Sequence, residues 1–192
     1  MARPPGNDRL ARRDILRAGL SLGAQLGLGA GLQAQNNRAA NRPQKGDLLV
    51  KAGDSTATPL TPADIRLAGR QVMAWAMDPV DKTVRSGSRL NRILVVRPDP
   101  AKLNAGTKAQ SAEGVVAYSA ICTHAGCEVT EWVPDGQKLF CPCHESTFDP
   151  ADDAKVIDGP ATRMLPALAL DVSDGKLIVR EPFTSPITFE TQ

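Results

Sequence analysis

The chain has few aromatic side chains, only two histidines and no internal repeat. Aromatic residues make up 4% of its 192 residues, with two Trp, one Tyr and four Phe. No segment recurs at the periods of about 20 to 50 residues that mark solenoid proteins. A glycine-rich phosphate loop and a Ser-His-Asp set are both missing. These absences exclude a repeat architecture and leave nothing that indicates a nucleotide-binding or hydrolytic enzyme.

A strong net charge is also missing from the part of the chain that we expect to fold. Residues 1–45 hold eight Lys or Arg against two Asp, a net charge of +6. The remaining residues hold fifteen basic and nineteen acidic side chains, a net charge of −4. Nucleic-acid-binding domains carry a basic face on their folded part. The charge distribution here is the reverse, so we expect no nucleic-acid partner.

Residues 1–34 have the layout of an export signal. The arginine pair Arg12-Arg13 precedes an uncharged run over 18–34, and this order resembles the twin-arginine signal. At about 1.5 Å per residue the run reaches roughly 25 Å as a helix, short of the ~30 Å hydrocarbon core of a bilayer. We therefore expect an export signal or a membrane anchor helix, with membrane association through residues 12–34.

The composition changes twice after this segment. Residues 35–46 (QNNRAANRPQKG) have no apolar periodicity and indicate a flexible linker. From residue 47 on, short β-forming runs alternate with Pro, Gly, Asp and Ser, and the sixteen Gly and fifteen Pro of the chain favour turns over long helices. We expect an all-β domain over 47–192, an antiparallel sandwich or small barrels. The expected strands are 48–50, 71–77, 90–97, 114–119, 168–172 and 176–180.

Two of these runs carry further detail. The run Ile93-Leu94-Val95-Val96 is continuously apolar, as in a strand that is buried on both faces. Ser173-Asp174-Gly175 separates the last two strands and favours a hairpin turn. The larger aromatic side chains have no special spacing, and we expect them to pack in the core or on the sheets.

All four cysteines and both histidines lie between residues 122 and 144. The segment Cys122-Thr123-His124-Ala125-Gly126-Cys127 is followed, after thirteen residues, by Cys141-Pro142-Cys143-His144. Thiolate and imidazole are ligands that hold iron or zinc. The pattern leaves three arrangements open: a Cys₂His₂ zinc site, a domain with disulfides only, and a [2Fe-2S] cluster with two Cys and two His ligands. Zinc is disfavoured, because Cys122-x-His124 is a cramped half-site where structural zinc usually takes Cys-x₂₋₄-Cys pairs.

The paired motif resembles that of the Rieske [2Fe-2S] proteins. Cys-Thr-His-x-Gly-Cys and Cys-Pro-Cys-His-x-Ser match their cluster-binding motif, and Gly159-Pro160-Ala161-Thr162 resembles their loop that covers the cluster. The resemblance spans roughly Val115–Val179. It implies a Rieske-type all-β fold with a cluster-binding part at about 115–165 and one [2Fe-2S] cluster per chain. It also implies the site residues: the iron ligands Cys122, His124, Cys141 and His144, the disulfide pair Cys127 and Cys143, and Ser146, whose hydroxyl donates to a cluster sulfur.

The ligand set and three departures from the family pattern bear on the reduction potential and on the site. Neutral imidazoles remove negative charge, so Rieske centres lie at about −150 to +300 mV against about −400 mV for all-cysteine plant-type ferredoxins. Phe148 stands where high-potential members carry a tyrosine that donates to a cysteine sulfur, so we expect a potential below theirs. Glu145 replaces the usual glycine after the second histidine, and Thr162 replaces the second proline of the covering loop.

The resemblance implies two functions. In the first, the protein is the iron–sulfur subunit of a quinol–cytochrome c reductase, takes an electron from quinol at His144 and has cytochrome b and a c-type cytochrome as partners. In the second, it is the electron-relay small subunit of a periplasmic molybdenum oxidase of the arsenite-oxidase type, bound to a large molybdenum subunit. A free-standing electron carrier is the third alternative. Ser146, the proline loop and the linker favour the first, and the short apolar segment favours the second.

Other Rieske classes fit less well. A mononuclear-iron oxygenase subunit would need two histidines beyond those of the cluster, and the chain has none. The export signal disfavours the cytoplasmic Rieske ferredoxins. We therefore expect the protein on the periplasmic side of the bacterial inner membrane, tethered or soluble after processing of the signal.

Overall fold

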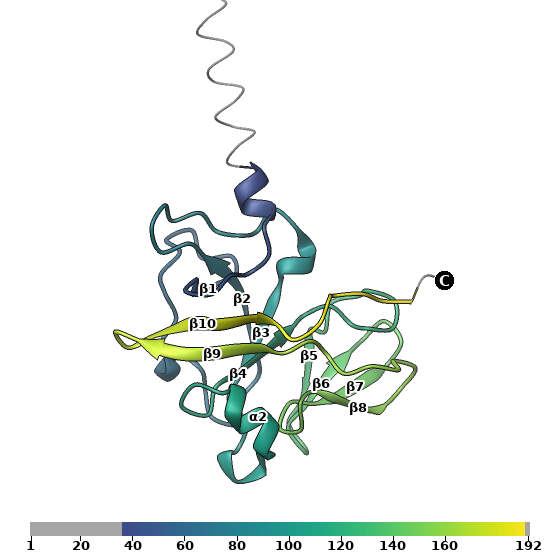
Figure 1. The fold of residues 1–192 in the computed structure, drawn as a ribbon. Coiled ribbons are helices and arrows are strands. Elements are labelled where there is room, and N and C mark those ends of the chain that lie inside the picture. Colours follow the sequence, from purple (N-terminus) through teal and green to yellow (C-terminus); the bar gives the residue numbers. More distant parts are fainter. Residues whose placement is uncertain (1–35, 191–192) are drawn as a thin grey trace, which may run out of the picture. The chain divides into compact units, whose positions relative to one another are not determined.

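The computed structural model describes residues 36–190, which form a mostly β structure with few helices (Figure 1). The expected export signal or anchor helix over 1–34 lies outside these residues. Within the described part, no helix is long and apolar enough to cross a membrane. Residues 36–40 are helical, and the remaining helical elements are α2 (Ala105–Gln110) and three short 3-10 turns (Pro62–Asp64, Arg89–Asn91 and Pro100–Lys102). The strands are β1 (Leu48–Lys51), β2 (Val72–Met77), β3 (Ile93–Val96), β4 (Val116–Ser119), β5 (Glu131–Val133), β6 (Lys138–Cys141), β7 (Ser146–Asp149), β8 (Lys155–Asp158), β9 (Leu168–Ser173) and β10 (Lys176–Phe183).

Six strands form a large antiparallel sheet in the order β4-β3-β2-β1-β10-β9. Its two edges meet, because Tyr118 on β4 bridges to Ala167 and the Ser119 N–H donates to the Pro166 carbonyl at 2.8 Å. The sheet is therefore nearly closed into a barrel. This confirms the expected all-β class, and the strand runs proposed from the sequence all overlap strands of this sheet.

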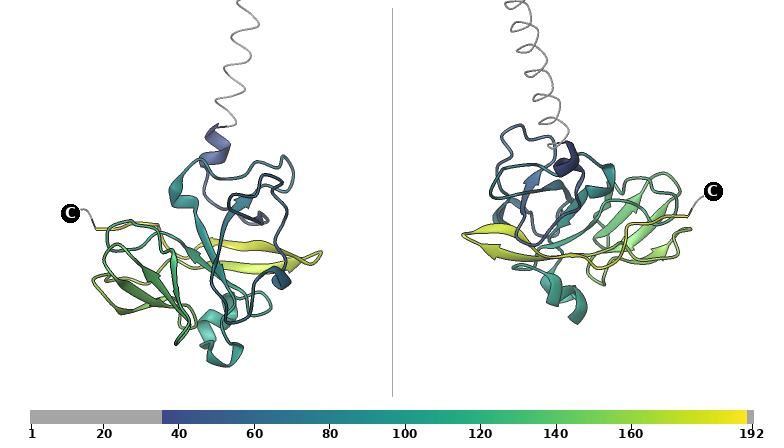
Figure 2. Two further views of the ribbon diagram at one scale, coloured as in Figure 1. Left: turned by 180° about the vertical axis from the view of Figure 1, so that it is seen from behind. Right: turned by 45° about the horizontal axis from the view of Figure 1, so that its top comes forward.

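A second, four-stranded sheet in the order β5-β6-β7-β8 is inserted between β4 and β9. Figures 1 and 2 show it in green beside the large sheet. Each sheet has its own apolar core, and β3 lies between the two. Ile93 and Val95 pack in the first core, while Leu94 and Val96 pack in the second. All four side chains of β3 are 0% exposed, which explains why its sequence is a continuous apolar run.

Residues 38–46 differ from the expected flexible linker, because they are bound to the domain. The side chain of Asn91 is fully buried and donates to the carbonyls of Asn41 at 2.7 Å and Ala40 at 3.3 Å. Further contacts of the segment are the hydrogen bonds Gly87 N–H to Ala39 O, Arg42 Nη1 to Leu90 O and Gly46 N–H to Val179 O. We call residues 38–46 the neck. Its partners are mostly backbone groups, which every sequence has, so a polar composition could not reveal the docking.

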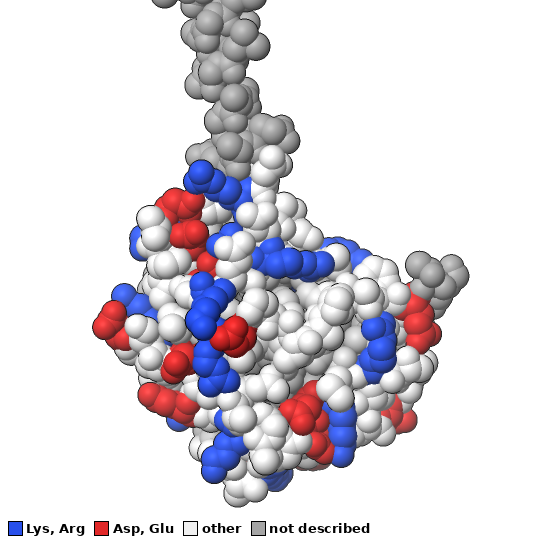
Figure 3. Space-filling model, viewed as in Figure 1, with Lys and Arg blue, Asp and Glu red and all other residues white. Residues whose placement is uncertain are grey.

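Charged side chains of both signs are interspersed on the face shown in Figure 3. One exposed pair joins the neck to β10, with Lys45 Nζ 2.9 Å from Glu181 Oε1. Another joins Arg70 to Glu131 on β5, with Arg70 Nη2 3.7 Å from Glu131 Oε2. Exposed pairs of this kind contribute roughly 0–1 kcal/mol each, so the fold depends on its two cores and its strand pairing.

Candidate metal centre

The first cysteine-histidine segment, residues 122–127, connects the two sheets between β4 and β5. A tight turn closes it, in which the Gly126 N–H donates to the Cys122 carbonyl at 3.0 Å and the Cys122 N–H donates to the Cys127 carbonyl at 2.8 Å. Gly126 has φ +75°, a conformation that glycine adopts without strain. Ile121 and Glu128 pair antiparallel on either side of this turn, so the first loop is the tip of a short hairpin.

The second segment is the tip of the β6–β7 hairpin. Cys141 ends β6 and pairs with Ser146, the first residue of β7. The Glu145 N–H donates to the Cys141 carbonyl at 3.0 Å. Glu145 has φ +63°, so a glutamate occupies a backbone conformation that suits glycine better. This gives a physical reason why a glycine is favoured at the position where this chain carries Glu145.

A disulfide between Cys127 and Cys143 joins the two loops, with the Cα atoms 6.5 Å apart. This is the pairing that the family resemblance implied. The bridge holds the first loop against the hairpin tip, so the sulfur and nitrogen donors of both loops face one another. The remaining cysteines, Cys122 and Cys141, are outside any disulfide.

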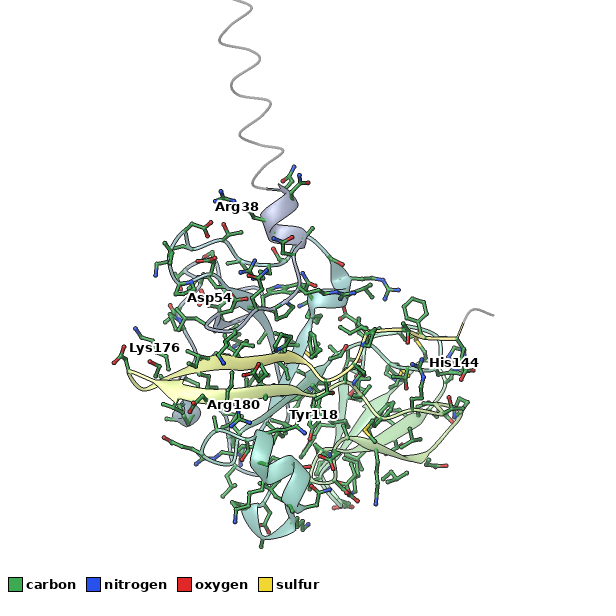
Figure 4. The ribbon with its side chains drawn as sticks, viewed as in Figure 1. Arg38, Asp54, Tyr118, His144, Lys176 and Arg180 are labelled. Atoms are coloured by element: carbon green, nitrogen blue, oxygen red, sulfur yellow. A yellow bond between two sulfur atoms is a disulfide. The ribbon has the colours of Figure 1, made fainter. Side chains whose placement is uncertain are left out.

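The four candidate ligands form a buried sulfur pair and an outer imidazole pair. Cys122 and Cys141 are each 1% exposed. The imidazole rings of His124 and His144 lie edge to face, with their centroids 4.7 Å apart. His124 is half-buried and His144 is exposed, and Figure 4 shows His144 at the outer end of the small sheet. An electron donor or acceptor would therefore meet the His144 side of the site.

The donor atoms of this site fit a bound metal group. His124 Nδ1 is buried and has no hydrogen-bond partner within the described residues. Buried polar atoms without a partner are rare, and an iron bound at this nitrogen would satisfy it. The Cys141 thiol hydrogen-bonds to the Cys122 sulfur, which lowers the pKa of Cys122 and raises that of Cys141. Two thiols that share protons in this way are suited to coordination as thiolates.

Hydrogen-bond donors surround the two sulfurs. Hydrogen bonding by the backbone N–H groups of His124 and Ala125 lowers the pKa of Cys122, and that of the Cys143 and His144 N–H groups acts in the same direction on the pKa of Cys141. The fully buried Ser146 hydroxyl also donates to the Cys122 sulfur. These donors stabilise negative charge on the sulfurs and so favour a reduced cluster.

The loop Gly159–Thr162 packs directly on the hairpin that carries Cys141 and His144. The Ala161 N–H donates to Ser146 Oγ at 3.1 Å, so one hydroxyl links the loop to the Cys122 sulfur. Gly159 has φ +85°, and a Cβ there would lie 2.5 Å from Ser146 Cα. The site thus requires glycine at position 159, because only glycine allows this approach.

Within the described ranges, no three or more His, Cys, Asp or Glu side chains converge as they would around a single metal ion. The family comparison decides what the site holds. The model of the Rieske [2Fe-2S] domain matches residues 62–169, more than half of the chain. The chain belongs to the Rieske [2Fe-2S] family. Its cofactor is therefore a [2Fe-2S] cluster, and its role is electron transfer, as the sequence motif predicted.

Curated relatives support the same conclusion. The cytochrome bc1 complex Rieske iron-sulfur subunit of Streptomyces lividans is 36% identical over 146 residues, which cover 74% of this chain and 85% of that protein. The subunit of the same name from Streptomyces coelicolor is also 36% identical, but the match covers 41% of its length. A putative respiratory nitrate reductase subunit Rieske of Haloferax mediterranei is 49% identical over 75 residues, 38% of this chain and 33% of that protein.

A solved Rieske structure is also similar. The cyanobacterial plasma membrane Rieske protein PetC3 from Synechocystis is 29% identical with a TM-score of 0.41, and the match covers 62% of this chain and 93% of that one.

The sequence motifs did not reveal one part of the Rieske site. The Glu190 N–H donates to the carbonyl of His124 at 2.8 Å, and the Phe189 ring lies against Gly126. Residues 184–190 therefore contact the first cluster loop, although they lie about 45 residues beyond the second motif. Four of these seven residues are polar, one is proline, and Ile187 and Phe189 are the two large apolar side chains, so no sequence pattern connects the segment to the metal centre.

Proposed function

We propose that Cys122 and Cys141 bind one iron of the cluster and that His124 and His144 bind the other. The burial of both thiols, the unpartnered Nδ1 of His124 and the facing imidazoles support this assignment. The disulfide between Cys127 and Cys143 then keeps the two ligand loops together as the charge of the cluster changes.

We further propose that the protein is the iron–sulfur subunit of a quinol–cytochrome c reductase of the bc1 type. The exposure of His144, next to the half-buried His124, is the observation that carries this proposal. A bound [2Fe-2S] cluster supplies a one-electron acceptor of comparatively high potential. The exposed imidazole of His144 offers a hydrogen-bonding group to a quinol hydroxyl and receives its proton. The Streptomyces relatives, named as bc1 subunits, support the same complex.

The partners in this proposal are cytochrome b, which would bind the quinol, and a c-type cytochrome, which would take the electron. The protein works on the periplasmic side of the bacterial inner membrane. Residues 12–34 provide the membrane association or the export signal.

The second candidate is an electron-relay subunit of a large molybdenum enzyme. The Haloferax relative favours it, since the match over 75 residues is 49% identical and that protein is named as a subunit of a nitrate reductase. In such a complex the domain has no substrate of its own, and His144 faces the large subunit.

One experiment distinguishes the bc1-type subunit from the relay subunit. The full-length chain is purified with an affinity tag from detergent-solubilised membranes of its own host. The bc1-type proposal predicts that haem b and haem c copurify, seen in reduced-minus-oxidised absorption spectra, and that the preparation reduces cytochrome c with added quinol. A preparation that contains molybdenum and no haem b would refute the proposal in favour of the relay subunit. A mock purification from the untagged strain is the control.

A further inference from the structure

Residues 184–190, which we call the C-terminal strap, run from the end of β10 to the cluster loops. Figures 1 and 2 show this yellow segment leaving the large sheet and passing along the green small sheet. Its start is fixed by two hydrogen bonds with Ala167, from the Thr184 N–H at 2.9 Å and to Thr184 Oγ1 at 3.0 Å. Ile187 in its middle is 8% exposed. The strap is therefore part of the folded domain.

The end of the strap contacts the backbone of the first cluster loop. The Glu190 N–H donates to the carbonyl of the ligand His124 at 2.8 Å. The Phe189 ring lies against Gly126 so closely that a Cβ on Gly126 would be 2.9 Å from it. Arg89 completes this contact: its guanidinium lies 5.5 Å from the Phe189 ring centroid and donates to the Gly126 carbonyl at 2.5 Å. The turn that carries His124 is thus held from two sides.

The same residues of the strap bind the covering loop. Thr162 Oγ1 donates to Glu190 Oε1 at 2.8 Å. The Arg163 guanidinium donates to both Thr188 Oγ1 at 2.7 Å and the Thr188 carbonyl at 2.9 Å. Glu190 therefore contacts the His124 loop through its backbone and the covering loop through its carboxylate. It is the point at which the two loops are joined.

We propose that the C-terminal strap is a positioning element of the cluster site and substitutes for the proline that the covering loop lacks at Thr162. Proline would fix the backbone at position 162 covalently. In this chain the Thr162 hydroxyl is bound by Glu190, and the strap fixes the loop from outside. The Thr162 N–H has no hydrogen-bond partner within the described residues, so a proline would remove no bond. The proposal rests on the cluster and is independent of the quinol reaction.

A chain that ends after Ile187 tests the proposal. It loses residues 188–192, which include Thr188, Phe189 and Glu190 of the strap, but keeps the buried Ile187. In the cluster-loaded full-length protein and in this variant, the rate of cluster loss to an iron chelator is followed by absorbance, and the g values of the reduced cluster are measured by EPR. We expect about tenfold faster loss, equivalent to ~1.4 kcal/mol, and changed g values. The matched control is Glu181→Ala, which removes another exposed carboxylate from an ion pair, that with Lys45, away from the cluster.

Two further variants decide the role of Thr162. Glu190→Ala in the full-length chain keeps the rest of the strap and should accelerate cluster loss several-fold. The proposal is overturned if the loss rate and the g values are unchanged both in this variant and in the shortened chain. Thr162→Pro in the shortened chain should restore most of the lost retention. Failure of this rescue would overturn the claim that the strap substitutes for proline. None of these measurements uses quinol or cytochrome, so their failure is distinct from failure of the bc1-type function.

Discussion

Ser146 is the residue whose single hydroxyl serves both the cluster and its cover. It accepts the Ala161 N–H at 3.1 Å and donates to the Cys122 sulfur. The donated hydrogen bond stabilises the more negative, reduced state more than the oxidised state. We therefore expect the Ser146 hydroxyl, which does not ionise, to raise the reduction potential.

Ser146→Ala should lower the potential. A hydrogen bond of about 0.5–1.5 kcal/mol corresponds to roughly 20–65 mV for one electron. A redox titration followed by EPR measures the change. Thr147→Val is the matched control, because Thr147 is the next residue and its hydroxyl contacts the Glu145 carbonyl at 3.5 Å. An unchanged or raised potential in Ser146→Ala would contradict the role of the hydroxyl.

Phe148→Tyr should change the potential in the opposite direction. Phe148 is 0% exposed and packs in the same core as Cys122 and Cys141. A tyrosine hydroxyl that donates to a cysteine sulfur should raise the potential by roughly 20–65 mV. Phe140→Tyr on the neighbouring strand β6, where the side chain is only half-buried, is the control. If Phe148→Tyr leaves the potential where it was, the comparison with high-potential Rieske proteins is wrong for this site.

At the scale of elements, three loops meet at the cluster site, and Gly159 sets how closely two of them approach. Gly159→Ala combines a left-handed backbone with a Cβ 2.5 Å from Ser146 Cα and 2.7 Å from the Glu145 carbonyl oxygen. We expect it to cost about 2–4 kcal/mol of stability. The measurement is the denaturant midpoint of the cluster-loaded protein together with its cluster content.

Gly175→Ala separates the two contributions. Gly175 also has a positive φ, +72°, but nothing lies within 4 Å of its added Cβ. This variant should lose only the backbone contribution of about 1–2 kcal/mol and keep its cluster. If Gly159→Ala and Gly175→Ala lose the same stability, the close approach of the covering loop to the hairpin contributes nothing to the free energy of unfolding.

The sequence predicted the large sheet better than the small one. The hairpin β9–β10 and its turn at 173–175 follow directly from apolar runs and turn residues. Strands β5 to β8 were not separately predicted, because they have three or four residues each and their burial patterns are short and mixed. Their positions follow from the cluster loops that they support. The motif thus predicted the ligands, whereas the elements that hold them required the structure.

At the scale of the whole molecule, the described chain is one domain with a docked neck. The neck was predicted as linker because its contacts use backbone carbonyls. The sequence also did not predict the ion pair next to the neck. Arg85 is 3% exposed, and its guanidinium binds the carboxylate of Asp47 at 2.6 and 2.8 Å. Polar contacts between distant segments leave no periodic signal in a sequence, so the sequence could not show that residues 38–46 are docked.

Asn91→Ala should release the neck. The Asn91 amide donates to the carbonyls of Ala40, Asn41 and Arg85, at 3.3, 2.7 and 3.0 Å. Loss of these bonds should cost about 1–3 kcal/mol and speed tryptic cleavage after Arg38 and Lys45. Mass spectrometry of the early fragments measures the rate. Asn41→Ala, at an exposed amide, should leave it unchanged; equal cleavage of both variants would mean that Asn91 does not hold the neck.

The central claim is that one [2Fe-2S] cluster has two histidine ligands. The chain contains only two histidines, His124 and His144, so labelling with ¹⁵N-histidine reports on these two alone. Pulsed EPR of the reduced, labelled protein is the most direct measurement. The account predicts strong hyperfine couplings to two distinct ¹⁵N nuclei. Coupling to one nitrogen or to none would contradict it.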